Sequence, residues 1–161
     1  MNLPGPAGLR GLDRFNAAPP ADAKAALLTC CGSRRWARRL AAHRPYPDPG
    51  ALLAAADEAG YDMSPADLAE ALAAEPAPGL CDSAPRSAHL ALGAAHAAYE
   101  SRFGHAFVIC LDAFDPAEHP DQVLAGIRAR LGHDIDQERI TAAEEIQRLA
   151  RGRVIALISD S

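Results

Sequence analysis

The stretch Phe103-Gly104-His105-Ala106-Phe107-Val108-Ile109-Cys110, here called the octet, decides how the rest of the chain is interpreted. A helix is predicted to run into it from Ser87, and Gly104 can end that helix because glycine adopts a left-handed conformation without steric cost. The residues from Ala106 to Leu111 are apolar. The run is too short to span a bilayer, and periodicity does not distinguish a buried strand from a helix end. Extended backbone buried among helices would need hydrogen-bond partners, and a small polar ligand could supply some of them.

The composition around the octet favours helices. Hydrophobic residues make up 49% of the 161 residues and aromatic residues only 5%, and alanine supplies much of the apolar count. Alanine is the strongest helix former and a poor filler of large cores. We therefore predict an all-α protein with a single compact domain of about seven or eight helices. Residues 1–10 are predicted to be a flexible N-terminus and residues 11–158 the helical domain.

Capping signals place the predicted helices. Ser33 follows Gly32 and can cap a helix, Asp48 precedes Pro49, and Ser64-Pro65-Ala66-Asp67 has the form of a capping box with an acid in fourth place. Gly60 is predicted to end a helix. The expected helices cover residues 21–31, 34–42, 51–58, 65–74, 87–102, 120–131 and 136 into the 150s. An irregular loop is predicted from residue 75 to about residue 85, because two prolines deny a helix its amide donors.

The charge pattern gives little support to nucleic-acid binding, because the formal net charge is −5. A cluster of Arg34, Arg35, Arg38 and Arg39 could hold an anion, and the alternative is a solvated helix face. Trp36 could either be a core residue or line a ligand pocket. No apolar segment suited to a signal peptide appears near the N-terminus, so we expect a reduced cytoplasmic protein that does not enter a membrane.

Metal binding also has weak support in the sequence. The cysteines show no Cys-x-x-Cys spacing, and we expect them to be small buried residues. His89 and His96 lie seven positions apart and share a helix face, but a metal site would require further ligands. The alternative is one hydrogen-bonded and one exposed histidine. We expect no metal and no cofactor.

A motif across the octet carries a family resemblance. The pattern Tyr99-x-x-Arg102-Phe103-Gly104-x-x-Phe107-Val108-Ile109-Cys110 resembles the hallmark of the decarboxylases of 2-oxo-4-hydroxy-4-carboxy-5-ureidoimidazoline (OHCU), which act in urate breakdown. The resemblance extends from about Leu12 to Leu157. Further landmarks appear in the order found in the family: Phe15-Asn16, Cys30-Cys31-Gly32-Ser33-x-x-Trp36, Arg44-Pro45-Tyr46, Arg130-Leu131-Gly132-His133 and Glu145-x-x-Arg148-Leu149-x-x-x-Arg153.

The resemblance implies a helical, homodimeric lyase that converts OHCU to (S)-allantoin without a cofactor. In the family, the histidine of a His-Pro-x-x-Gly motif acts as the acid–base group, an acid in a following Glu-Gln pair assists it, and backbone groups of the Phe-x-Val-Ile-Cys stretch line the substrate pocket. The corresponding segment here is Glu75-Pro76-Ala77-Pro78-Gly79, so Glu75 replaces the histidine. The chain between Gly79 and His96 is shorter than in the family and lacks the Glu-Gln pair. His96 stands where asparagine is common.

These departures suggest two candidate catalytic residues, Glu75 and His96. A histidine can donate a proton near neutral pH, whereas a glutamate with an ordinary pKa of about 4.3 is an anion that would repel the substrate carboxylate. Burial could raise the pKa of Glu75 enough to make it a donor. The alternative for Glu75 is a solvated residue at a helix end. The predicted substrate-binding residues are Pro76, Phe107, Val108, Ile109, Cys110 and Trp36.

Three functions remain open from the sequence. The first is cofactor-free decarboxylation of OHCU with rearranged acid–base groups. The second is a catalytically altered or inactive relative that binds another small ligand or a protein partner. The third is an enzyme with a changed substrate. The retained landmarks favour a preserved fold, and Glu75 favours lost or changed activity, but fold alone does not decide function.

Overall fold

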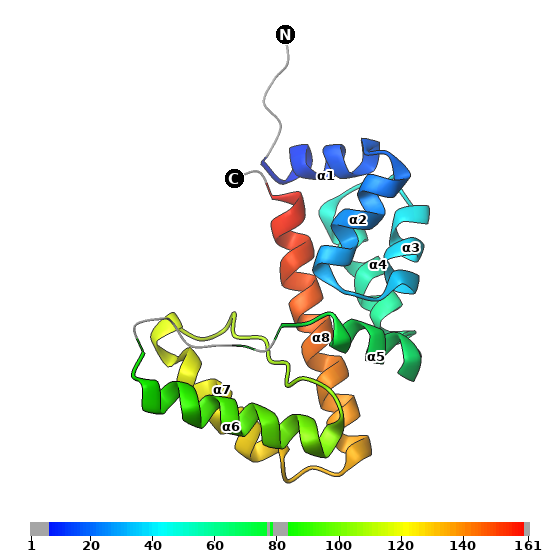
Figure 1. The fold of residues 1–161 in the computed structure, drawn as a ribbon. Coiled ribbons are helices and arrows are strands. Elements are labelled where there is room, and N and C mark those ends of the chain that lie inside the picture. Colours follow the sequence, from blue (N-terminus) through cyan, green and yellow to red (C-terminus); the bar gives the residue numbers. More distant parts are fainter. Residues whose placement is uncertain (1–6, 77, 79–83, 160–161) are drawn as a thin grey trace. The chain divides into compact units, whose positions relative to one another are not determined.

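The computed structural model describes residues 7–76, 78 and 84–159, and most of these residues lie in helices. Within these residues the model contains α-helices, one short 3-10 helix and no strand (Figure 1). The all-α prediction is confirmed. None of the helices described is long and apolar enough to cross a membrane. The elements are α1 (Ala7–Ala17), α2 (Pro20–Cys30), α3 (Arg34–Ala42), α4 (Pro49–Tyr61), α5 (Pro65–Ala73), α6 (Arg86–Phe103), η1 (Pro116–Glu118), α7 (His119–Arg130) and α8 (Ile135–Ile158).

The chain packs into two compact units. The first unit comprises residues 1–71 and 147–161, and the second comprises residues 72–146. Helix α8 therefore contributes its first half to the second unit and its last half to the first. Each unit has its own set of buried residues, so each is described separately.

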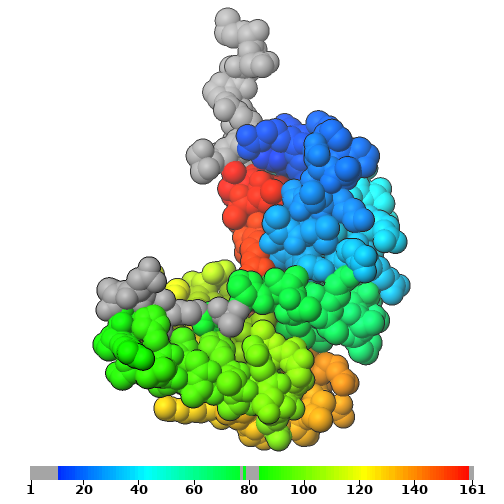
Figure 2. All heavy atoms as spheres, viewed as in Figure 1, coloured from blue at the N-terminus to red at the C-terminus, as the bar shows by residue number. Residues whose placement is uncertain are grey.

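The first unit is built from α1 to α4, most of α5 and the end of α8. Figure 2 shows the atoms of α1 to α3 gathered in blue to cyan. Trp36 is central to the packing, because it is 2% exposed and its indole N–H donates to the Ala56 carbonyl at 3.2 Å. Other buried side chains come from all parts of this unit and include Leu12, Phe15, Leu27, Leu40, Leu52 and Val154.

The predicted caps of the first unit are confirmed. The Ser33 hydroxyl accepts the backbone N–H of Trp36 at 3.2 Å, and Asp48 accepts that of Ala51 at 2.8 Å. Ser64 and Asp67 form the reciprocal capping box, with both side-chain-to-backbone distances at 3.1 Å. Each cap satisfies amide groups that have no partner inside the helix.

The second unit packs α6 and α7 against the octet. Its core contains Leu92, Tyr99, Phe107, Val123 and Ile127, all almost completely buried. Helix α6 ends at Phe103 as predicted, because Gly104 has a φ of 78° and donates its N–H to the Glu100 carbonyl at 2.8 Å. The octet beyond Gly104 is neither helix nor strand. It is an irregular, partly buried segment, which resolves the alternative left open by its periodicity.

Two helix boundaries differ from those expected. Helix α1 begins at Ala7, within the segment expected to be the N-terminal extension. Gly60 does not end α4, which continues to Tyr61. Gly60 is buried, and an added Cβ there would lie 3.1 Å from the Gln147 side chain, so this glycine serves close packing. Residues 1–6 of the expected N-terminus and residues 77 and 79–83 of the expected loop lie outside the described residues.

Gly126 should be intolerant of a methyl group, because α7 approaches Phe107 closely at this point. An added Cβ would lie 3.0 Å from the Phe107 ring, which is fully buried and cannot move aside easily. Gly93 in α6 has no atom within 4 Å of the corresponding position. We expect Gly93→Ala to raise the free energy of unfolding by about 1 kcal/mol. The free energy of unfolding of Gly126→Ala should be about 1–3 kcal/mol lower than that of Gly93→Ala. Urea denaturation of both variants measures the difference, and equal gains would contradict the packing described.

Candidate functional site

The two ring nitrogens of His96 differ in their surroundings. Its Nε2 lies 2.8 Å from the Pro78 carbonyl oxygen. Because a carbonyl only accepts hydrogen bonds, Nε2 carries a hydrogen in this contact. The other nitrogen, Nδ1, is buried and has no hydrogen-bond partner among the described residues. The ring lies 6.2 Å from that of Phe107, measured between centroids. In the neutral ring, Nδ1 therefore presents a free lone pair beside the octet.

Glu75 lies in the bend that follows α5. Its side chain is half-buried, and its backbone N–H donates to the Leu72 carbonyl at 3.2 Å. Pro76, the next residue, is exposed. The contact between His96 and Pro78 brings the histidine to the segment that follows Glu75 directly. A direct role for Glu75 beside His96 stays a prediction.

The octet offers backbone groups as well as apolar side chains. Phe107 and Val108 are buried, whereas Ile109 and Cys110 are half-buried. The Cys110 N–H donates to Glu145 Oε2 at 2.9 Å. Between described residues, no hydrogen bond is made by the peptide groups of Phe107 or Ile109. Such groups need a partner when they are removed from bulk water, so they are available to a ligand or an ordered water.

The Cys110 thiol is a poor candidate for a nucleophile. Burial raises its pKa above the usual value, which keeps the sulfur protonated and weakly reactive near neutral pH. Contact between Cys110 and a substrate stays a prediction.

A buried ionic network supports the octet, and the sequence analysis did not predict it. The Arg130 guanidinium donates through Nη1 to the Val108 carbonyl at 2.6 Å and through Nε to Glu138 Oε1 at 2.7 Å. The same carboxylate oxygen accepts the Tyr99 hydroxyl at 2.5 Å. His133 Nδ1 lies 3.0 Å from the second carboxylate oxygen, Glu138 Oε2. The network thus joins α6, α7, α8 and the octet.

The network holds the octet backbone in place from one side. Glu138 is fully buried, and Arg130 is 6% exposed with its guanidinium carbon 4.3 Å from the Phe107 ring centroid. Burial, and then the hydrogen bond to Glu138, raise the pKa of the Tyr99 hydroxyl well above its ordinary value, so it remains a neutral donor. The only sequence signal for this network was the Arg130-Leu131-Gly132-His133 landmark. That landmark does not reveal that Glu138 is the partner of Arg130.

Trp36 belongs to the first unit, whereas the other predicted site residues belong to the second. Its burial and its hydrogen bond to Ala56 account for it as a core residue. Contact between Trp36 and a substrate stays a prediction. His89 is exposed, and among the described residues no group of three or more metal-ligating side chains gathers at one place.

Comparisons with known proteins identify relatives of this fold. The crystal structure of an (S)-allantoin synthase superposes with a TM-score of 0.71 at 20% identity, covering 91% of this chain and 53% of that one. The crystal structure of an OHCU decarboxylase in the presence of (S)-allantoin gives a TM-score of 0.72 at 22% identity, covering 81% of this chain and 95% of that one. The chain thus spans about half the length of the allantoin synthase. A search of curated proteins gave no match.

The sequence profile of the OHCU decarboxylase family matches residues 16–89 and 79–155. The two matched segments overlap in residues 79–89. These residues lie within the stretch between Gly79 and His96 that was predicted to be shorter than in the family. Together they cover most of the chain, and the structural similarities agree with them in fold. The chain therefore belongs to the OHCU decarboxylase family.

Proposed function

We propose that this protein decarboxylates OHCU to (S)-allantoin and that His96 is its acid–base residue. The observation that carries the proposal is the buried, unpartnered Nδ1 of His96 beside the octet. The family normally uses a histidine from another position, which Glu75 occupies here. The relatives described above are named for OHCU decarboxylation and for (S)-allantoin synthesis, and the shared fold supports the same chemistry in this chain.

The reaction needs one proton for each carbon dioxide released. When the bond between the ring carbon and the carboxylate breaks, both bonding electrons stay on the ring carbon and carbon dioxide leaves. A proton from the imidazolium form of His96 would then be transferred from Nδ1 to that carbon. The neutral ring that remains takes a new proton from water. Because Nε2 donates to Pro78 in both forms, the ring can keep its orientation throughout the cycle.

The remaining site residues would bind the substrate. The peptide groups of Phe107 and Ile109 can exchange hydrogen bonds with the ureido and ring groups of OHCU, while Val108 and Cys110 are held by Arg130 and Glu145. Glu75 is the second proton carrier in this proposal. Pro76 and Trp36 are included as apolar contacts, without a role in proton transfer. No cofactor takes part in this scheme.

We further propose that the protein is a cytoplasmic homodimer. The basis of this proposal is the family resemblance. Size-exclusion chromatography with light scattering measures the mass of the particle, and a monomer at micromolar concentration would contradict the dimer.

The decisive experiment generates OHCU in place, because the compound decays spontaneously. Urate oxidase and hydroxyisourate hydrolase produce it from urate, and circular dichroism follows the appearance of chiral allantoin with and without this protein. We expect faster formation of the S enantiomer in its presence. A rate equal to spontaneous decay would instead favour the alternative, a family member that binds a different ligand or a protein.

A further inference from the structure

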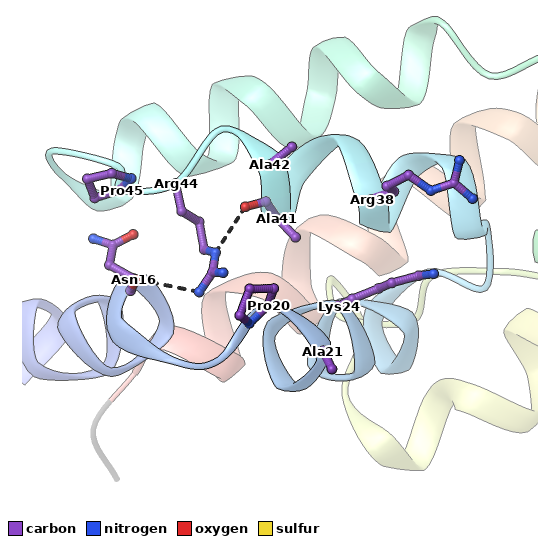
Figure 3. Close-up of a pocket in the computed structure, with 9 residues that line it drawn as sticks. All are labelled: Asn16, Pro20, Ala21, Lys24, Arg38, Ala41, Ala42, Arg44 and Pro45. Atoms are coloured by element: carbon purple, nitrogen blue, oxygen red, sulfur yellow. Dashed lines mark hydrogen bonds between the residues drawn. The ribbon is translucent and has the colours of Figure 1, made fainter.

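A pocket in the first unit is lined by none of the residues assigned to the proposed reaction. It has a volume of about 550 Å³, which falls within the range of small-molecule sites. It lies between α2 and α3, closed at one end by the end of α1 and by the turn after α3 (Figure 3). Its walls are largely apolar and include Pro20, Ala21 and Ala42.

The polar side chains that line this pocket are cationic or neutral, and none is acidic. The cations are Lys24, Arg38 and Arg44. The neutral side chain is Asn16, whose amide group forms two hydrogen bonds of 2.9 Å with the backbone of Tyr46. The positive charge of the pocket is therefore not neutralised by its own lining.

Arg38 differs from the other members of the arginine cluster on α3. Arg34 pairs with Glu70, Arg35 with Asp67, and Arg39 with Asp62 and Glu58. Arg38 is the member that lines the pocket, and in the part of the chain that the structure describes neither Arg38 nor Lys24 has an ion-pair partner. Figure 3 shows both side chains extending away from Arg44 along the pocket.

Arg44 is a fixed charge toward the opposite end. Its Nη1 donates to the carbonyls of Phe15 at 2.8 Å and Ala18 at 2.7 Å, and its Nε donates to that of Ala41 at 3.0 Å. The second terminal nitrogen, Nη2, makes no hydrogen bond to another described residue. Because the guanidinium is held by backbone oxygens, Nη2 is a donor with little conformational freedom left to lose on binding.

We propose that this pocket binds a small organic anion with a short apolar body, such as a dicarboxylate or a phosphate ester. Lys24 and Arg38 at one end and the fixed guanidinium of Arg44 toward the other match a ligand with acidic groups at both ends. The alanine and proline walls match the carbon chain between them. This site is independent of the proposed decarboxylation, since it contains neither His96 nor any residue of the octet.

Succinate is a suitable probe, and succinamide is its neutral counterpart of similar shape. Amide chemical shifts of the labelled protein, recorded at low salt to limit screening, report where each compound binds. We expect succinate to shift the amides of Lys24, Ala42 and Arg44 with saturation, and succinamide to leave them unchanged. Inorganic phosphate should bind to the same residues more weakly, because it cannot reach both ends of the pocket.

Two variants test the origin of the affinity. The double variant Lys24→Gln/Arg38→Gln should weaken succinate binding about tenfold or more, because it removes two charge-assisted donors. The variant Ala42→Phe keeps the charge and should block the pocket sterically. The matched control is Arg86→Gln/Arg128→Gln, which loses the same charge at two exposed residues of the second unit and should bind as the unchanged protein does.

Several results would overturn the proposal. One is equal weakening by the two double variants, which would indicate a general charge effect. Another is succinamide binding as tightly as succinate, or unchanged binding in Ala42→Phe. A third is the absence of saturable shifts at the pocket amides with succinate and phosphate. Each is measured on folded protein, as judged by the dispersion of the remaining amide signals.

Discussion

Replacing Arg130 with methionine should lower the free energy of unfolding by about 3–5 kcal/mol, because it leaves the carboxylate of Glu138 buried without its cation. Glu138 is completely buried, and its Oε1 accepts from both Arg130 and Tyr99. The Val108 carbonyl would also lose its donor. Since small domains are stable by only about 5–15 kcal/mol, this variant would be close to unfolding. Urea denaturation monitored by circular dichroism measures the loss.

The same helix provides the control for Arg130. Arg128 is exposed two residues earlier in α7, so Arg128→Met should change stability by less than about 0.5 kcal/mol. A double variant, Arg130→Met/Glu138→Leu, removes both charges and should recover part of the loss, because an apolar pair of similar volume can replace a buried ion pair. A loss below about 1 kcal/mol in Arg130→Met would mean that the pair behaves like an exposed salt bridge.

Replacing His96 with asparagine should slow formation of (S)-allantoin by about 10²–10⁴-fold, the usual contribution of an acid–base group. Asparagine can still donate to the Pro78 carbonyl but has no group that gains or loses a proton near neutral pH. The effect should appear in kcat, with KM nearly unchanged, because the proton is transferred in the reaction step. The coupled assay from urate measures both constants.

The control for His96 lies seven residues earlier on the same helix. His89 is exposed, so His89→Asn should keep full activity. Glu75→Gln tests the second candidate, and full activity in both His96→Asn and Glu75→Gln would reject the acid–base assignment. If the unaltered protein proves inactive, Glu75→His restores the family histidine at its usual position and tests whether the rest of the site is intact.

Local features of the fold could be predicted because their causes are local. The caps at Ser33 and Ser64 and the helix end at Gly104 depend on residues within one turn, and all three are present. The predicted helix end at Gly60 was wrong because glycine at a helix end and glycine at a close contact are identical in sequence. The Gln147 side chain that packs on Gly60 is far along the chain, so no local pattern indicates it.

The roles of the candidate site residues stay predictions, and their hydrogen bonds could not be predicted from the sequence. The ring of His96 on α6 lies beside that of Phe107 in the octet that follows the helix. The free Nδ1 depends on which atoms surround the ring, as does the pairing of Arg130 with Glu138. These are contacts between separate elements, and a sequence pattern with a helical period contains no information about them.

The division of α8 between the two units constrains the order in which the protein can fold during its synthesis. Val154 and Ile158 are buried in the first unit, and Arg153 donates to the Cys30 carbonyl at 3.2 Å. Residues 7–71 leave the ribosome well before these partners are translated. The nascent first unit therefore exposes apolar surface until residues 147–158 emerge, which is a period of vulnerability to aggregation and a reason for chaperones to engage it.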